Sequence, residues 1–394
     1  MKKLLHAFPI LLALVFFSVL FQCKEAKNED TSKKSEDMTE DKIAITQSEF
    51  GKTKDGLVVN QYTLKNRNGV EMNVITYGGR ITSLKVPNKS GEFENIILGF
   101  DNLEAYEADN PFFGALIGRY GNRIANGKFN LNGEEYALAT NDGSNHLHGG
   151  VDGYDRVVWK AEPIEGSEDS ALKLTYLSKD GEEGYPGNLN VTVIYTLTND
   201  NAVEVTYEAT TDKSTVVNLT QHAYFNLTGD FSKDILNHDV VINADTYLPV
   251  DETLIPTGEI RKVEGTPFDF TSPKKIGKEI NADNEQLKRG KGYDHCWVLN
   301  GTKGNMRFVA SAFDEDSGRF MEILSTEPAI QFYTGNFLDG TLSMPNGGTY
   351  NHRTGFCLET QHYPDSPNQE KFPSTVLNPG ETYKTKTTFK FSTK

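Results

Sequence analysis

The chain has 394 residues, of which 24% are charged, and 40 Lys and Arg against 55 Asp and Glu give a formal net charge of -15. A nucleic-acid binder needs a basic surface, because Lys and Arg must replace the counterions condensed on the phosphates. No stretch of this chain is dominated by basic residues, so composition excludes that class of protein. The charges of residues 1–42 cancel, so the whole excess lies on residues 43–394. This favours a soluble domain with neutral or cationic ligands.

The N-terminus has the pattern of an export signal. Lys2 and Lys3 precede a mainly apolar run over residues 10–21, which has the length of a signal-peptide core and is shorter than the ~20 residues of a spanning helix. Cys23 follows this run. With Leu20 three positions before it, Cys23 resembles the lipidation site of a bacterial lipoprotein, although the residue directly before the cysteine is Gln22 and not the usual small residue. We expect residues 1–23 to be a signal peptide with Cys23 lipidated. An ordinary secretory signal is the alternative.

Residues 24–42 are almost entirely charged and polar. Such a segment cannot bury enough apolar surface to fold, so it is predicted to be a flexible tether. Together these features predict an exported protein that contacts the membrane only through a lipid anchor and faces the periplasm or the cell surface. A soluble periplasmic or secreted protein is the alternative.

Two cysteines remain after Cys23, at Cys296 and Cys357. In an oxidising compartment they could form a disulfide. The chain has no small Cys-rich scaffold that would need one. We therefore expect two buried, unpaired thiols.

From residue 43 onward, apolar and polar residues alternate in short runs bounded by turn residues, which is the pattern of half-buried strands. Hairpins are indicated by Asn132-Gly133 and by the break at residues 199–201, and a last strand covers residues 383–391. Helical periodicity is confined to residues 103–107 and 281–288. With no repeat and no second change in composition, residues 43–394 are predicted to be one all-β domain. Its expected fold is a large antiparallel β-sandwich with a few short helices.

Five clusters of polar residues and glycines are candidate sites, at residues 118–124, 145–150, 220–227, 292–297 and 356–361. In the first, Arg119 and Arg123 could bind hydroxyls or carboxylates, or form structural salt bridges. In the second, His146 and His148 would share one face of a strand at a metal-ligand spacing. No third ligand is evident, so we expect no metal. Gly149 and the next glycine indicate a close backbone approach, as a ligand site would need.

His222 and Glu359 are the titratable residues of two later clusters. His222 has apolar neighbours in the sequence, and such a residue belongs either to a core or to a site. Glu359 interrupts an apolar run, so burial is expected to raise its pKa. A paired structural carboxylate is the alternative for Glu359.

In this order and at these separations, the clusters resemble the aldose 1-epimerase (galactose mutarotase) family. The matching segments extend across the domain from about Thr53 to Phe391 and are GRYGNRIANGKF (118–129), NHLHGG (145–150), GYDRVVW (153–159), residues 221–227, GYDHCW (292–297), IQFYTGNFLDG (330–340) and GFCLETQHYPDSPNQ (355–369). The resemblance implies a galactose mutarotase-like sandwich, a small-molecule sugar substrate and no cofactor or metal. It also implies Glu359 as general base and His222 as general acid. Sugar hydroxyls would be held by the matching positions Asn122, Arg123, His148, Asp294 and Gln331.

The implied reaction interconverts the α and β anomers of free aldohexoses such as galactose and glucose. A base removes the proton of the anomeric hydroxyl while an acid protonates the ring oxygen, so the ring opens without redox or metal chemistry. The preferred aldose and the oligomeric state stay open. One alternative is a glycoside hydrolase or lyase on a related sandwich, for which Glu359 and Asp294 would supply two carboxylates. Others are an exported carbohydrate-binding protein and a hexose-6-phosphate mutarotase, the latter disfavoured because phosphosugars are intracellular.

Overall fold

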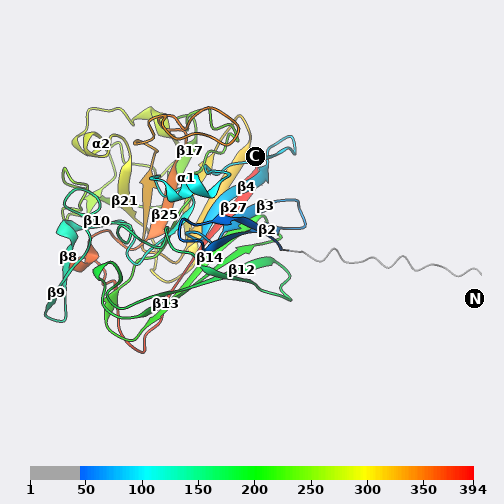
Figure 1. Ribbon diagram of the computed structural model, residues 1–394. Helices are drawn as coiled ribbons and strands as arrows, with labels where there is room; N and C mark the ends of the chain where they lie inside the picture. The colour runs from blue at the N-terminus through cyan, green and yellow to red at the C-terminus, as the bar shows by residue number, and fades with distance from the viewer. Residues whose placement is uncertain (1–44) are drawn as a thin grey trace, which may run out of the picture. The chain divides into compact units, whose positions relative to one another are not determined.

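Strands dominate the computed structural model, which describes residues 45–394 (Figure 1). The described residues fall within one compact unit. The predicted signal peptide, tether and lipidation of Cys23 lie outside them. Among the helices of the described part, none has the length and apolarity to cross a membrane.

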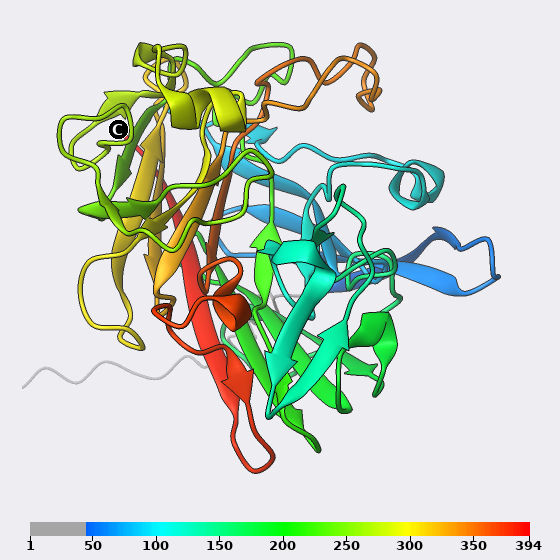
Figure 2. The same ribbon diagram turned by 90° about the vertical axis from the view of Figure 1, so that its left-hand side faces the viewer.

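The largest sheet has nine strands, all paired antiparallel. In sheet order they are β11 (Lys160–Pro163), β12 (Ser170–Ser178), β13 (Leu189–Leu197), β14 (Ala202–Thr211), β27 (Tyr383–Thr393), β23 (Arg319–Ser325), β22 (Arg307–Phe313), β17 (Asp239–Ile242) and β20 (Lys274–Lys275). The predicted hairpin of β13 and β14 is present, and β27 is the predicted last strand. This strand lies between β14 and β23, inside the sheet, where Figure 2 shows its long red ribbon.

Two five-stranded antiparallel sheets complete the framework. The N-terminal sheet contains, in order, β1 (Thr46–Lys52), β2 (Val58–Lys65), β3 (Glu71–Ile75), β4 (Arg80–Pro87) and β5 (Phe93–Asn95). The other, which we call the catalytic-side sheet, contains β19 (Arg261–Lys262), β18 (Thr246–Leu248), β21 (Asp294–Val298), β24 (Ala329–Tyr333) and β25 (Cys357–Gln361). Four further two-stranded sheets are present in the described part of the chain: β6 (Ala115–Ile117) with β16 (Thr220–His222), β7 (Arg123–Ile124) with β10 (His146–Leu147), β8 (Lys128–Leu131) with β9 (Glu134–Ala137), and β15 (Thr215–Val216) with β26 (Val376–Leu377).

The main core joins buried side chains of all three large sheets, for example Val74, Val193 and Phe332. Along β13 the residues alternate between buried and more exposed positions, as the period of a strand requires. Each large apolar side chain removed from water contributes about 1.5–3 kcal/mol. The expected all-β sandwich is therefore the observed architecture.

The predicted short helices, the hairpin at Asn132 and the free cysteines are present, and one of the helices is shifted along the chain. Helix α1 covers Leu103–Glu107 as predicted, whereas α2 covers Glu285–Gly290 and begins later than the expected 281. The cause is Asn284, whose side chain accepts hydrogen bonds from the first-turn backbone of α2 and so fixes its start. Asn132 and the glycine after it have positive φ, as a tight hairpin requires. Cys296 and Cys357 are buried free thiols, as expected.

Candidate active site

One hollow of about 130 Å³ brings together all the residues expected to act on or hold a sugar. Three of them stand on neighbouring strands of the catalytic-side sheet, and the others come from β16, β7 and the loops beside β7 and β10. They are Asn122, Arg123, His148, His222, Asp294, Gln331 and Glu359, and the hollow is completed by Pro111, Phe112, Leu147, Tyr224, Tyr333 and Phe337.

The catalytic-side sheet supplies the acidic side of the hollow. Gln331 on β24 lies opposite Glu359 on β25, so the two side chains share a face. The Gln331 amide donates a 2.7 Å hydrogen bond to Oδ1 of Asp294 on β21. Oε2 of Glu359 and Oε1 of Gln331 are buried and have no hydrogen-bond partner among the described residues. Buried acceptors are normally satisfied, so these two oxygens are free to accept from ligand hydroxyls.

His222 faces Glu359 across the hollow. Its Nε2 lies 3.7 Å from Oε1 of Glu359, which is beyond hydrogen-bond distance, so each group keeps its bonding capacity. The ring of Tyr224 stacks on the imidazole with centroids 5.2 Å apart, and Sγ of Cys357 lies 3.6 Å from Nδ1. These two neighbours hold the His222 ring with Nε2 toward the carboxylate.

His148 forms the third side of this group. Its ring centroid is 5.1 Å from that of His222, and the backbone N–H of Asn122 donates to its Nδ1 at 3.2 Å. Because Nδ1 accepts, Nε2 carries the proton when the ring is neutral. Asn122 and His148 both have left-handed φ values, 64° and 52°. Such strained backbone is typical of functional sites.

His146 and His148 do not lie on one strand face, so the prediction that their side chains share a face was wrong. Strand β10 ends at Leu147, and the positive φ of His148 turns the chain. His146 instead makes hydrogen-bond contacts with the Ala139 carbonyl at 2.7 Å and the Tyr185 hydroxyl at 2.6 Å. The structure gathers a different set, because the ligating atoms of His148, His222 and Glu359 lie within 4.8 Å of one another. That set offers two imidazole nitrogens and a carboxylate oxygen that can form hydrogen bonds with hydroxyl groups.

The glycine pair after His148 was also misinterpreted. A Cβ on Gly149 would collide with the backbone oxygen of Gly118, and one on Gly150 would collide with the Glu183 side chain. The close approach predicted from these glycines is therefore to the chain itself. This close packing fixes the loop that carries His148, and it leaves no room for a ligand beside the two glycines.

The two arginines of the first cluster take different roles. Arg119 is 1% exposed and donates to the carbonyls of Pro186 and Gly187, so it is structural. Arg123 lines the hollow, and its Nε donates to Asp142 at 2.7 Å. The predicted salt bridge is therefore present at Arg123, with Asp142, whereas Arg119 is held by backbone carbonyls and forms no ion pair among the described residues.

Burial shifts the pKa values of Glu359 and His222 in opposite directions. Desolvation raises the pKa of Glu359 well above its ordinary value, and the Asp294 carboxylate raises it further, against the opposing charge of Arg123. The predicted rise is confirmed. Desolvation lowers the pKa of His222 to about 3 and holds that of His148 well below its usual range. Because an ionised Glu359 would favour a protonated His222 only 3.7 Å away, the two groups titrate as a pair.

Comparisons with known proteins identify the family of the chain. The family model for aldose 1-epimerase matches residues 60–390. The chain belongs to the aldose 1-epimerase family. It is 46% identical over 351 residues to the galactose mutarotase of Bos taurus, an alignment that covers 89% of this chain and 99% of the relative. Identity to the aldose 1-epimerase of Escherichia coli is 41% over 341 residues, or 86% of this chain and 96% of that one.

Solved structures of the family share the fold. The structure of galactose 1-epimerase from Lactobacillus acidophilus is 31% identical, with a TM-score of 0.78, and the match covers 89% of this chain and 99% of that chain. A Caenorhabditis elegans aldose epimerase homologue gives a TM-score of 0.76 at 28% identity over 89% of this chain and 99% of that one.

In this member of the aldose 1-epimerase family, sequence reasoning missed the aromatic wall of the site. The Phe112 ring lies 4.7 Å from that of His148 and 5.7 Å from that of His222, measured between centroids. Phe337 also lines the hollow and is 47% exposed. Its position within the segment 330–340 was the available signal, whereas Phe112 lies outside every cluster and becomes visible only in the folded chain.

Proposed function

We propose that the protein interconverts the α and β anomers of free aldohexoses such as galactose and glucose, with Glu359 as general base and His222 as general acid. The observation that carries this proposal is the facing pair itself. Nε2 of His222 and Oε1 of Glu359 lie 3.7 Å apart in one buried hollow, and Oε2 of Glu359 has no partner there. A base that reaches the anomeric hydroxyl and an acid that reaches the ring oxygen bonded to the same carbon are what ring opening requires.

The proton transfers balance without any other reactant. Glu359 takes the proton of the anomeric hydroxyl, His222 gives its proton to the ring oxygen, and the bond between the anomeric carbon and the ring oxygen breaks. Rotation about the adjacent carbon–carbon bond then presents the other face of the new carbonyl. Closure runs the same transfers in reverse, and the two side chains return to their starting states.

This cycle starts from ionised Glu359 and protonated His222. Burial alone favours the neutral form of each group. The bound sugar therefore has to shift the protonation equilibrium of the pair toward the two charged forms. Sugar hydroxyls that donate to the free oxygen of Glu359 favour its charged form. A carboxylate 3.7 Å from Nε2 in turn favours the imidazolium. A desolvated pair of this kind is both a strong base and a strong acid.

The remaining polar groups hold the sugar. Arg123, oriented by Asp142, and Asp294, bonded to Gln331, offer donors and acceptors for hydroxyls. His148 is neutral at physiological pH because burial lowers its pKa. It therefore donates from Nε2 without adding charge, which suits a neutral substrate.

The test is Glu359→Gln assayed by polarimetry with galactose and with glucose. We expect the rate of anomer exchange to fall by about 10²–10⁴-fold, while galactose still binds, because the amide retains the shape of the carboxylate. Glu208→Gln, on a half-solvated strand of the nine-stranded sheet, is the matched control and should behave as the wild type. Retention of more than a few per cent of the rate in Glu359→Gln would contradict the assignment of the base.

The competing enzyme classes predict different products. A hydrolase or lyase that uses Glu359 and Asp294 would release sugar from nitrophenyl galactosides or oligosaccharides, and we expect none. A purely carbohydrate-binding protein would bind galactose without anomer exchange by NMR. We expect exchange, because a binding role does not account for a buried acid and base that face each other.

We also propose that the enzyme is exported and anchored through lipidated Cys23. The supporting observations are the short apolar run before Cys23 and the polar segment after it. In the native host the full-length protein should fractionate with membranes, and Cys23→Ser should move it to the soluble exported fraction or leave it unprocessed. Recovery of the wild type from the cytosol would contradict export.

A further inference from the structure

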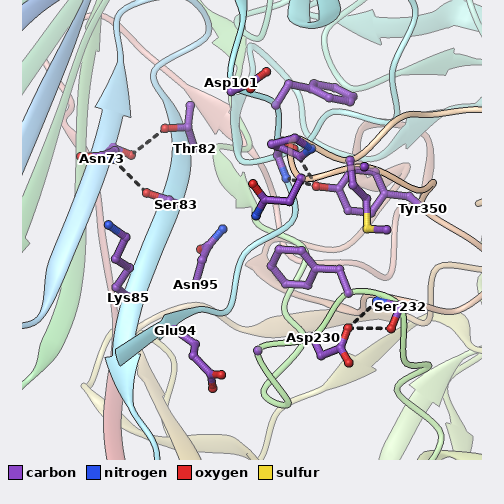
Figure 3. A pocket seen from close by; sticks show the side chains of 18 of the residues that line it. Asn73, Thr82, Ser83, Lys85, Glu94, Asn95, Asp101, Asp230, Ser232 and Tyr350 are labelled. Carbon is purple, nitrogen blue, oxygen red and sulfur yellow. Dashed lines mark hydrogen bonds between the residues drawn. The ribbon is translucent and has the colours of Figure 1, made fainter. Parts of the chain in front are cut away.

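A second hollow, larger than the catalytic one, lies against the N-terminal sheet. It has a volume of about 700 Å³ and lies between strands β2–β5 and the loops at residues 229–232 and 344–350 (Figure 3). A neighbouring hollow of about 270 Å³ shares four of its lining residues, Phe100, Asp101, Met344 and Pro345. We call the two together the sheet–loop groove. Neither has a lining residue in common with the catalytic hollow.

The floor of the sheet–loop groove is polar. Gln61, Asn73 and Ser83 stand on β2, β3 and β4, on the face opposite to the buried Met72 and its neighbours in the core. Asn73 and Ser83 are cross-strand partners, and the Asn73 amide donates to the Ser83 hydroxyl at 3.0 Å. Figure 3 shows these side chains on one side of the hollow, with Tyr350 and Asp230 on the other. The floor therefore presents amides and hydroxyls in fixed positions.

Aromatic rings stand at the edge of the same groove. Phe50 and Phe231 line it, and both are half-buried at the edge of a buried aromatic cluster. The Phe231 ring centroid is 6.1 Å from that of Tyr350, whose hydroxyl donates to the Gly99 carbonyl at 2.6 Å. Each of these two phenylalanines thus keeps part of its ring available to a ligand. A pyranose has two apolar C–H faces and a rim of hydroxyls, which match ring faces and amides respectively.

The charges of the groove disfavour an anionic ligand. Its lining carries three carboxylates, Glu94, Asp101 and Asp230, against one cation, Lys85. Glu94 is paired with Arg319 at 2.6 Å, so Asp101 and Asp230 are the two lining carboxylates without an ion pair among the described residues. Lys85 already donates to Glu71 at 2.9 Å, so its charge is balanced. A phosphate or sulfate would meet no free cation among these lining residues. The groove therefore fits a neutral polar ligand.

We propose that the sheet–loop groove binds a neutral oligosaccharide chain at a site separate from the active site. A chain fits better than a single sugar because the groove continues past Met344 and Pro345 into the neighbouring hollow. Packed rings separate the two sites: Tyr350 lies 5.1 Å from Phe113, which lies 4.9 Å from Tyr224, the residue that stacks on His222. This inference does not rest on the proposed catalytic function.

The test uses oligosaccharides of galactose, glucose and xylose whose reducing ends have been converted to alditols, so that they carry no hemiacetal for the active site. Binding to the whole protein is measured by calorimetry in the presence of saturating galactose. We expect at least one of the three to bind, and Phe231→Ala to weaken that binding about tenfold, because it removes an aromatic contact and its buried area. Phe231→Tyr should restore it, since the ring is kept.

Phe93→Ala is the matched control, because Phe93 is an exposed phenylalanine on β5 that does not line the groove. It should leave oligosaccharide binding unchanged, and both alanine variants should retain the wild-type mutarotation rate. The proposal is overturned if none of the three oligosaccharides binds, if galactose alone displaces them, or if Phe231→Ala binds as the wild type does. Tighter binding of a sulfated oligosaccharide than of its neutral parent would also overturn it.

Discussion

Two buried pairs of glutamate and histidine occur among residues 45–394, and they differ in the distance between their members and in the ionisation of their carboxylates. In the catalytic hollow, Glu359 and His222 are 3.7 Å apart. In the second pair, Nδ1 of His362 lies 2.9 Å from Oε2 of Glu327, and the Tyr383 hydroxyl donates to the other carboxylate oxygen at 3.2 Å. The first pair is separated and keeps open bonding capacity in the catalytic hollow, whereas the second lies at ion-pair distance beside another hollow, although its two facing atoms lack hydrogen-bond geometry.

The surroundings give the two carboxylates opposite ionisation behaviour. Burial raises the pKa of both, but at Glu327 the charge of His362 and the hydroxyl hydrogen bonds outweigh burial, and the pKa falls below its ordinary value. At Glu359 the next contribution is the Asp294 carboxylate, which adds to burial, and the pKa rises. Burial of a carboxylate beside a histidine therefore does not by itself indicate a catalytic group. The distance to the partner and the charge of the next neighbour decide which role the pair can take.

The largest contrast is expected in the histidine variants. His222→Asn should reduce the mutarotation rate by about 10²–10⁴-fold, because it removes the general acid, with little change in thermal unfolding. His362→Asn should do the reverse and retain most of the rate while it lowers the melting temperature. Polarimetry and calorimetry on the same two preparations measure both effects. If His222→Asn unfolds at a much lower temperature, His222 is a core residue and the assignment of the acid is wrong.

The sequence was sufficient for part of this contrast. Glu359 could be selected because a carboxylate interrupts an apolar run. The Asp294–Gln331 hydrogen bond joins residues 37 positions apart through strand register, which one sequence does not encode visibly. His148 could not be placed because its orientation depends on a left-handed φ of 52° that the surrounding fold imposes. The roles of the site residues came from the family resemblance, since spacing alone left both interpretations of His222 open.

A smaller but measurable effect is expected in the ion pair. Glu327→Gln removes the carboxylate that lies 2.9 Å from His362 and should cost about 3 kcal/mol of unfolding free energy. Because the folded pKa of Glu327 is lowered, its stabilising effect is present above the unfolded pKa and is lost as pH falls through the folded pKa. The loss in Glu327→Gln should therefore shrink toward acid pH in urea titrations. A difference that stays constant with pH would contradict the ion pair.

Glu359→Gln should give the smallest effect on stability, and one of opposite sign. The folded pKa of Glu359 is raised, so its protonated form stabilises the fold at low pH, and this contribution is lost as pH rises through the folded pKa. A glutamine stays neutral throughout. The variant should therefore match the wild type near pH 4 and exceed it by about 1 kcal/mol at alkaline pH, as expected when a destabilising catalytic group is removed. Urea unfolding at both pH values measures the difference. If the unfolding free energy of the wild type instead increases relative to that of the variant as pH rises, the Glu359 carboxylate is stabilised by the fold in the same way as that of Glu327. The contrast between the two pairs then fails.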